Sequence, residues 1–384
     1  MEHRQRNEQS GRRLVYVITE DWFFASHFLD RALAAVSSGY QVTVVTRCRE
    51  FSKQLQGSGL SFINIEFARR GLNPIREIYT ILQLRKIFRQ LQPHIVHNIA
   101  LKPVVLGSIA AQLARVRNVV NALVGMGYVF TSAETQARLL RPFVNSSIRY
   151  VLNKPNTRVV IENNDDLNNL VEGRFAKREA ISLVKGAGVD LLKFSHQQEP
   201  ALPLKVVMVS RMLRDKGVVE FVQAASLLTR EFPDAQFILA GDTDSGNPTS
   251  ISHKQLNDWS QSGCVQWIGN QTDISTLLAK SHIACLPSYR EGLPKSLIEA
   301  AAAGRPIVTT DVPGCREVVT DGVNGFLVPS RNSSALASAI QKLILSPSLR
   351  VKMGAANRRK AELEFANEII ISQTQKIYES FATI

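Results

Sequence analysis

Short runs of β-branched and other apolar residues alternate with helical patterns along the first half of the chain. Phe28–Ser37 and Ile75–Leu91 carry apolar residues at three- and four-residue spacing, which predicts helices with one buried face. Such an alternation is typical of a parallel sheet covered by helices. We expect the strands at Leu14–Thr19, Gln41–Thr46, Phe62–Ile65, Ile95–His97, Asn118–Asn121 and Arg158–Glu162.

The alternation restarts after residue 204 and predicts a second sheet. Between the two series, Ile181–Pro203 contains two glycines and little periodicity, which indicates a joint. A chain of 384 residues is too long for one ordinary core. We therefore predict an α/β chain of two doubly wound, Rossmann-like domains, residues 1–190 and 191–384, that face each other across a cleft. The strands of the second series are expected at Lys205–Ser210, Gln236–Ala240, Val265–Ile268, His282–Leu286, Pro306–Thr310 and Gly325–Val328.

The predicted architecture also indicates where functional residues should lie. In doubly wound sheets, ligands bind beyond the carboxyl ends of the strands, so both domains should present loops to the cleft. A last helix, over about residues 365–384, is a candidate to pack back on the first domain. Functional residues are therefore expected in the segments that directly follow strands.

Composition places the chain among globular proteins, with 45% hydrophobic and 21% charged residues. The four cysteines lie far apart without zinc-ligand spacing, which indicates free thiols in a reducing compartment. Residues 1–13 are polar and do not resemble a secretion signal. The apolar stretch Val104–Val124 is interrupted by Arg115 and Arg117, so we predict no membrane-spanning helix and a cytoplasmic protein.

The net charge of +13 is unevenly distributed. Residues 1–190 hold 26 Lys and Arg against 15 Asp and Glu, whereas residues 191–384 hold 20 against 18. A basic half beside a near-neutral half indicates an anionic partner for the first domain, such as a membrane surface or a phosphate-bearing substrate. A basic surface that is only solvated explains the charge equally well. Nucleic acid is not an expected partner, because the basic residues are scattered without an aromatic-interleaved motif.

Segment 286–306 carries the most informative pattern in the chain. A strand is expected to end at Leu286, and a loop through Glu291 and Gly292 leads to a helix that begins near Pro294. Backbone N–H groups at such a helix start bind phosphate well. Glu299 lies about 7 Å further along the helix axis. Because carboxylates suit hydroxyls rather than phosphate, the layout fits a sugar–diphosphate–nucleoside, although a glutamate pair at this spacing is by itself weak evidence.

Two cations follow the first strand of the second domain. Arg211 and Lys216 lie where both could reach a diphosphate, and fixed cations aimed at developing charge are often the largest catalytic contribution. Such cations would serve a mechanism without a metal ion. We expect no metal and no cofactor, only a nucleotide sugar as co-substrate. Asp242 and Asp244 match an acidic metal-binding pattern superficially, and we interpret them as turn residues.

Jointly, these motifs resemble the family 4 retaining glycosyltransferases of GT-B fold, over most of the chain. The motifs are Ser-Arg211 with Lys216-Gly, Leu-Ala-Gly241, Pro-Ser-Tyr-Arg-Glu291-Gly-Leu-Pro, Glu299-Ala, and Val-Pro-Gly314-Cys-Arg-Glu317. The resemblance implies that Glu291 contacts the transferred sugar and Glu299 the ribose, while Arg211 and Lys216 hold the diphosphate of the nucleotide sugar. The other donor-binding candidates are Ser210, Gly292, Leu293, Pro294 and Lys295, with Thr272 and Asp273 beside the base.

The first half resembles a narrower branch, the capsule and exopolysaccharide transferases that build sugars on a polyprenyl-diphosphate carrier. Residues 17–27, 95–103 and 121–132 carry this resemblance. It implies that the first domain binds a polyprenyl-diphosphate-linked sugar acceptor and that His97 lies beside the reacting sugar. Many family members have a glycine-rich loop after the first strand, whereas this chain has the bulky segment Thr19–His27. The acceptor-binding candidates are Glu20, Asp21, His27, Lys102, Gly125 and Gly127.

The expected reaction moves a hexose or N-acetylhexosamine from a nucleotide sugar, by resemblance a UDP sugar, to a lipid-linked acceptor with retention of configuration. It would serve cell-surface polysaccharide or O-antigen assembly. Nothing beyond Glu291 offers a carboxylate nucleophile, so we expect front-face transfer. The basic first domain further predicts peripheral docking on the anionic inner face of the cell membrane, through segments 69–89 and 138–152. Ordinary inward-packing helices are the alternative.

Other classes of protein share parts of this pattern. A nucleotide-sugar epimerase of the same fold would need no acceptor, and a related transferase could act on a soluble acceptor. A dinucleotide dehydrogenase fits the strand–helix alternation, but no GxGxxG follows the first strand of either domain. A requirement for an acceptor separates the favoured function from the epimerase, and the kind of acceptor separates it from the related transferase.

Overall fold

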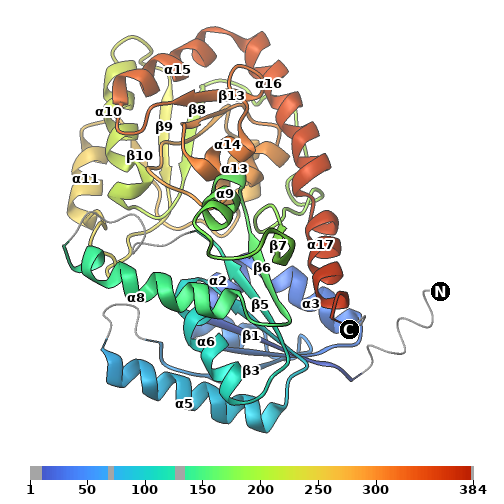
Figure 1. Ribbon diagram of the computed structural model, residues 1–384. Helices are drawn as coiled ribbons and strands as arrows, with labels where there is room; N and C mark the ends of the chain where they lie inside the picture. Colours follow the sequence, from blue (N-terminus) through green and yellow to red (C-terminus); the bar gives the residue numbers. More distant parts are fainter. Residues whose placement is uncertain (1–10, 68–72, 126–134, 382–384) are drawn as a thin grey trace. The chain divides into compact units, whose positions relative to one another are not determined.

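The computed structural model describes residues 11–67, 73–125 and 135–381 (Figure 1). The chain divides into two compact units, one of residues 1–187 with 368–384 and one of residues 188–367. Each unit is built on a wholly parallel sheet with helices between its strands, so the predicted α/β class is confirmed. Within the described ranges, no helix has the length and apolarity that crossing a bilayer requires.

The first unit has a seven-stranded sheet in the order β3-β2-β1-β4-β5-β6-β7. At its centre, β4 is buried at all five positions, as expected for a parallel strand that is covered on both faces. The short edge strand β7 was not predicted, because three residues are too few to show a period. The strands are β1 (Arg13–Glu20), β2 (Gln41–Arg47), β3 (Leu60–Asn64), β4 (Ile95–Ile99), β5 (Asn118–Leu123), β6 (Thr157–Ile161) and β7 (Ile181–Leu183).

Alternate residues of β1 face two different cores. Tyr16 packs with buried residues of α2, α3 and α17, whereas Val15 and Val17 pack with Leu84 of α5 and with α6. The last helix, α17, therefore belongs to the first unit although it is last in the sequence. The helices of this unit are α2 (Asp21–His27), α3 (Leu29–Ser37), α4 (Glu50–Gln54), α5 (Pro74–Leu91), α6 (Leu101–Leu113), α8 (Thr135–Leu152), α9 (Asn164–Glu172) and α17 (Asn367–Glu379).

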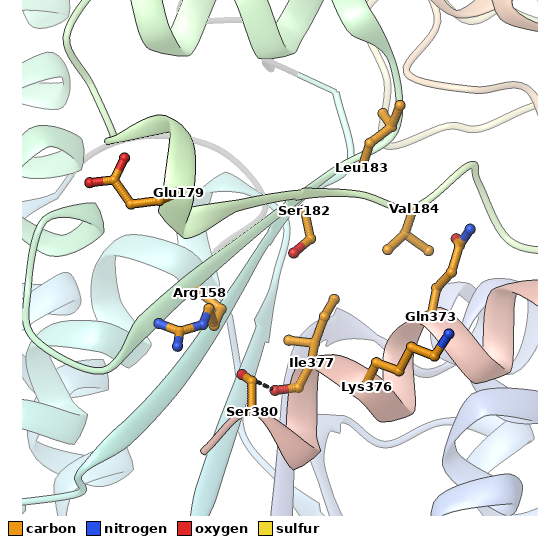
Figure 2. A pocket seen from close by; sticks show the side chains of 9 residues that line it. All are labelled: Arg158, Glu179, Ser182, Leu183, Val184, Gln373, Lys376, Ile377 and Ser380. Atoms are coloured by element: carbon orange, nitrogen blue, oxygen red, sulfur yellow. Dashed lines mark hydrogen bonds between the residues drawn. The ribbon is translucent and has the colours of Figure 1, made fainter. Parts of the chain in front are cut away.

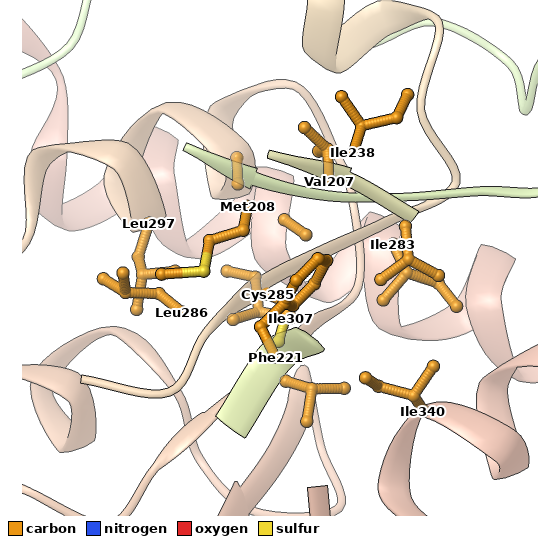
Figure 3. Close-up of a cluster of buried hydrophobic side chains, with 14 of the residues drawn as sticks. Val207, Met208, Phe221, Ile238, Ile283, Cys285, Leu286, Leu297, Ile307 and Ile340 are labelled. Carbon is orange, nitrogen blue, oxygen red and sulfur yellow. The ribbon is translucent and has the colours of Figure 1, made fainter. Parts of the chain in front are cut away.

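The second unit has a six-stranded sheet in the order β10-β9-β8-β11-β12-β13 around one large apolar core (Figure 3). Phe221, Leu297 and Ile340 pack on its strands from three helices. Each such burial contributes about 1.5–3 kcal/mol. The elements are β8 (Lys205–Val209), η2 (Arg214–Lys216), α10 (Val218–Leu228), β9 (Gln236–Ala240), α11 (His253–Gln261), β10 (Gln266–Trp267), α12 (Ile274–Ala279), β11 (Ile283–Leu286), α13 (Lys295–Ala302), β12 (Ile307–Thr310), α14 (Pro313–Val318), β13 (Gly325–Val328), α15 (Ser333–Leu345), α16 (Pro347–Lys360) and η3 (Ala361–Phe365).

The strand order of the second unit brings its candidate residues to one edge. Strand β8 pairs in parallel with β9 on one side and with β11 on the other. Because neighbouring parallel strands end at the same edge, the segments after β8, β9 and β11 lie next to one another. These segments carry Arg211, Lys216, Asp244 and Glu291.

Candidate functional site

Arg211 forms an ion pair at the carboxyl edge of the second sheet. Its Nη1 lies 2.8 Å from Oδ2 of Asp244, which belongs to the segment after β9. The interpretation of Asp244 as a turn residue was therefore incomplete, since its side chain also neutralises a cation. Ser210, which precedes Arg211, donates its hydroxyl to the carbonyl of Arg211.

Lys216 and Glu291, which the sequence places 75 residues apart, meet directly. Lys216 Nζ lies 2.5 Å from Glu291 Oε1. The Lys216 side chain is 21% exposed and that of Glu291 10% exposed, so the pair is largely shielded from water. Removal of either partner would leave the other as a largely buried charge without compensation, which destabilises the fold.

The two loops that carry this pair are bonded together through their backbones. The N–H of Tyr289 donates to the Asp215 carbonyl at 2.8 Å, and the Ser288 hydroxyl donates to the same oxygen at 3.1 Å. Gly217 has a φ of +77°, and a Cβ there would lie 2.0 Å from the Pro287 carbonyl oxygen. The close approach of the loops therefore requires glycine at position 217.

Tyr289 anchors the Glu291 loop to the body of the unit. Its hydroxyl donates to Glu220 Oε1 of α10 at 2.6 Å, and the Arg331 guanidinium lies 4.7 Å from its ring centroid. Burial, aided by the bond to Glu220, raises the pKa of Tyr289 to about 12. Sequence reasoning missed both Tyr289 and Glu220, although the position of Tyr289 two residues before Glu291 was a signal for the first.

A second glycine supports this loop from the start of α14. The N–H of Gly314 donates to the Glu291 carbonyl, and a Cβ on Gly314 would lie 2.2 Å from the Gly292 carbonyl oxygen. The Thr310 hydroxyl donates to the Ser288 carbonyl. The backbone on both sides of Glu291 is thus fixed by three neighbouring segments.

Helix α13 follows the loop and begins at Lys295, with Pro294 as its N-cap residue and no side chain as a cap. Leu293 is buried beside it. Glu299 is also buried, and Lys295 Nζ lies 3.6 Å from its Oε1. Burial raises the pKa of Glu299, while the charge of Lys295 opposes that rise.

Thr272 and Asp273 lie in the segment after β10, at the same edge of the sheet. Asp273 caps α12 by accepting hydrogen bonds from the Thr276 N–H and the Ser275 hydroxyl. Hydrogen bonding from the side chain of Thr276, the side chain of Ser275 and the backbone of Thr276 lowers the pKa of the Asp273 carboxyl. The structure gives Asp273 a capping function, and its contact with a base stays a prediction.

His97 is buried in the first unit, with 1% of its surface exposed. Its Nδ1 forms a 2.8 Å hydrogen bond with the hydroxyl of Tyr378 on α17, which in turn bonds the Tyr16 hydroxyl at 2.7 Å. Burial, with a smaller effect from Arg31, lowers the pKa of His97 to about 3. Among the described residues, no group bonds its Nε2. In this conformation the imidazole lies beneath the surface of the first unit, and its place beside the reacting sugar stays a prediction.

The neutral state of His97 predicts how stability depends on pH. An unfolded chain protonates this histidine near pH 6.5, whereas the folded chain resists protonation down to about pH 3. The contribution of His97 to folding is thus complete above pH 6.5 and is lost as the pH falls toward 3. From pH 7 to pH 5, the wild type should lose about 2 kcal/mol more of unfolding free energy than His97→Gln. Urea titrations at both pH values measure this difference, and equal losses would contradict it.

Glu20 and Asp21 are both buried and engaged with neighbouring segments. Glu20 Oε1 accepts from Arg47 Nη1 at 2.9 Å, and Asp21 Oδ2 accepts from the N–H groups of Arg49 and Ser52. Of the bulky segment Thr19–His27, the first two residues end β1 and Asp21–His27 form helix α2. Asp21 therefore caps the start of α4, and a role for either carboxylate at an acceptor stays a prediction.

The remaining acceptor-binding candidates are spread along the first sheet. The His27 ring lies 4.3 Å from that of Phe23, and Lys102 Nζ lies 2.6 Å from Glu77 Oε1. Gly125 lies two residues after β5 with a φ of +90°, a conformation that favours glycine, and its contact with an acceptor stays a prediction. Gly127 lies outside the described residues.

A pocket of about 300 Å³ in the first unit lies between β6, β7 and α17. Arg158, Ser182 and Ile377 are among the residues around it (Figure 2). None of the residues that line it was a sequence-predicted site residue. No residue of the Lys216–Glu291 site is among those that line it.

Two parallel-sheet units, with paired cations and carboxylates at the carboxyl edge of the second, define the GT-B class of glycosyltransferases. Sucrose-phosphate synthase from Thermosynechococcus elongatus has the same fold, with a TM-score of 0.80 at 19% identity over 97% of this chain and 100% of that chain. This likeness confirms the predicted GT-B fold.

Two family models identify the chain within this class. The model "Glycosyl transferase 4-like" matches residues 13–164, and "Glycosyl transferases group 1" matches residues 193–360. The N,N'-diacetylbacillosaminyl-diphospho-undecaprenol α-1,3-N-acetylgalactosaminyltransferase of Campylobacter jejuni is 30% identical over 353 residues, 88% of this chain and 91% of that protein. The UDP-Gal:α-D-GlcNAc-diphosphoundecaprenol α-1,3-galactosyltransferase of Escherichia coli is 26% identical over 287 residues, 71% of this chain and 72% of that protein. The chain belongs to the family 4 glycosyltransferases, as its motifs predicted, and is an enzyme of that family.

Proposed function

We propose that the protein transfers a hexose or N-acetylhexosamine from a UDP sugar to a polyprenyl-diphosphate-linked sugar, with retention of configuration, at the inner face of the cell membrane. The observation that carries this proposal is the convergence of Arg211, Lys216 and Glu291 at the ends of neighbouring strands. The names of both relatives support the acceptor class, and that of the E. coli relative supports UDP.

Arg211 and Lys216 hold the diphosphate in this proposal. Without a donor, each cation is neutralised by a carboxylate, Asp244 or Glu291. A diphosphate that binds between the cations replaces these carboxylates as their partner. As the bond between the sugar and the diphosphate breaks, negative charge grows on the leaving group, and fixed cations stabilise it.

Glu291 and Glu299 recognise hydroxyl groups. Once Lys216 turns to the diphosphate, the Glu291 carboxylate accepts hydrogen bonds from the transferred sugar, while its backbone stays fixed by Gly314 and Tyr289. Glu299, buried beside Lys295, accepts from the ribose hydroxyls. Hydrogen bonds to charged acceptors are stronger than neutral ones, so both contacts favour a correctly placed donor.

Retention follows if attack and departure use the same face of the sugar. The acceptor oxygen forms a bond to the anomeric carbon as the bond from that carbon to the diphosphate oxygen breaks, and the acceptor proton passes to the departing diphosphate. No carboxylate acts as a nucleophile. The anomeric coupling constant of the product, measured by NMR, should match that of the donor, and an inverted product would refute this step.

The transfer itself is tested with purified protein, a panel of UDP sugars and three acceptor conditions. A short-chain polyprenyl-diphosphate sugar, a soluble sugar without diphosphate and no acceptor are compared, with products identified by mass spectrometry. We expect transfer to the lipid-linked sugar only. Equal transfer to the soluble sugar would mean that the enzyme does not require a lipid-linked acceptor. Conversion of the donor without acceptor would favour an epimerase.

A further inference from the structure

Helix α5 exposes an unusual apolar stripe. Ile75, Ile78, Tyr79 and Leu82 are 79%, 56%, 61% and 49% exposed. Their spacing of three, four and seven residues places them on one face of the helix. The opposite face carries residues such as Leu84, which is buried against the sheet. Single exposed apolar residues are common on proteins, but a contiguous row of four marks an interaction surface.

The same helix carries a strong positive charge. Arg76, Arg85, Lys86 and Arg89 stand against one carboxylate, Glu77, so the net charge of α5 is +3. Lys86 and Arg89 are exposed, and their spacing from Leu82 continues the exposed face toward the end of the helix. The outward face of α5 is thus apolar in its first turns and basic in its last turns.

The apolar part lies at the carboxyl edge of the first sheet. Helix α5 follows β3 along the chain, so its first turn is at the end where the parallel strands finish. There Glu77 pairs with Lys102, at the start of α6 just after β4. Ligands of such sheets bind at this edge. In Figure 1, α5 lies on the outside of the first unit next to α6.

The apolar first turns and basic last turns of α5 together indicate which kind of partner fits this surface. A second copy packed stripe against stripe in antiparallel fashion would bury the apolar residues of both helices, but the basic last turns would point away from each other and gain no anionic partner. A bilayer with anionic headgroups satisfies both halves at once, because an interfacial helix buries its apolar side chains among acyl chains while Lys and Arg contact lipid phosphates.

We propose that the outward face of α5 docks the protein on an anionic lipid bilayer. Ile75, Ile78, Tyr79 and Leu82 enter the boundary between headgroups and acyl chains, and Lys86 and Arg89 bind lipid phosphates. This inference rests on the proposed function for its purpose, since docking brings the carboxyl edge of the first sheet to the surface that would hold a polyprenyl-linked acceptor.

Co-sedimentation with vesicles tests the proposal on the full chain. The vesicles contain phosphatidylethanolamine with phosphatidylglycerol, and phosphatidylcholine vesicles provide a neutral surface. The apolar variant combines Ile75→Gln, Ile78→Gln and Leu82→Gln, and the charge variant combines Lys86→Gln with Arg89→Gln. We expect the wild type to bind anionic vesicles more tightly than neutral ones. The apolar variant should lose roughly tenfold or more of the partition coefficient.

The charge variant should lose roughly tenfold on anionic vesicles and show a weaker dependence on salt. A matched control, Leu345→Gln with Val351→Gln, removes two exposed apolar side chains from the second unit and should bind like the wild type. Circular dichroism confirms that each variant is folded. Unchanged binding of the apolar variant, or equal loss in the control, would overturn the proposal.

Two further readouts separate docking from catalysis and from self-association. With a short-chain, water-soluble acceptor, the apolar variant should keep the kcat of the wild type, because docking is not needed there. Vesicle binding by a wild type that fails to transfer sugar would leave docking intact and overturn the proposed function instead. A change of oligomeric state in the apolar variant, with vesicle binding unchanged, would assign the stripe to a second copy.

Discussion

Replacing Lys216 with alanine is expected to lower kcat by about 10²–10³-fold, the usual cost of removing one group that stabilises developing charge. The ammonium lies 2.5 Å from Glu291, and the Lys216 side chain is only 21% exposed. Water molecules that enter after its removal therefore cannot replace its charge. The substitution also leaves the Glu291 carboxylate unpaired beside the incoming sugar. Steady-state kinetics with a UDP sugar and the lipid-linked acceptor measure the effect.

Controls for Lys216→Ala use another lysine and the partner carboxylate. Lys254→Ala removes an exposed lysine of the same unit and should leave kcat unchanged. Glu291→Gln keeps the shape of its side chain, and the double variant should be less impaired than the sum of the two single effects, because the residues act as one pair. Full additivity, or a kcat of Lys216→Ala within about twofold of the wild type, would mean that the pair is not part of the reaction.

Gly217→Ala is expected to destabilise the second unit by about 2–5 kcal/mol and to lower activity as well. Its φ of +77° strains any residue with a Cβ, and that Cβ would lie 2.0 Å from the Pro287 carbonyl oxygen. The loops that carry Lys216 and Glu291 must then move apart. Urea denaturation gives the stability change, and kcat shows whether the loop position matters for the reaction.

Gly263→Ala is a matched control for this effect. Gly263 has nearly the same φ, +80°, but open space where its Cβ would lie. Gly263→Ala should therefore lower the free energy of unfolding only by the backbone strain, about 1–2 kcal/mol, and leave kcat unchanged. If the two variants were equally stable and equally active, the close contact between the loops would have no consequence for stability or for the reaction.

The fold was predictable because buried parallel strands leave a strong pattern. Strands such as β8 are almost wholly apolar, and the restart of the alternation after residue 204 indicated two units. The edge strand β7 and the helix α2 were missed, the first because it is too short for a period. The second, which contains Trp22, Phe23 and Phe24, has seven residues, too few for a clear helical period.

The candidate site was predictable only in part. Segments that follow strands β8 and β11 could be expected at one edge, so Lys216 and Glu291 were candidates before their contact was known. The contacts of Asp244 and Tyr289 could not be predicted, because their partners, Arg211 and Glu220, come from segments that only the folded sheet brings near. The bond between Tyr378 and His97 spans 281 residues, and no local pattern indicates it.

The equilibrium binding of UDP and of UMP, by isothermal titration calorimetry, tests the central claim that the carboxyl edge of the second sheet holds the donor diphosphate through Arg211 and Lys216. The wild type should bind UDP roughly tenfold or more tightly than UMP, because each further charge-assisted contact strengthens binding. Arg211→Ala and Lys216→Ala should each lose most of that preference while their affinity for UMP changes less. The same preference for UDP in both variants, or no binding of UDP by the wild type, would contradict it.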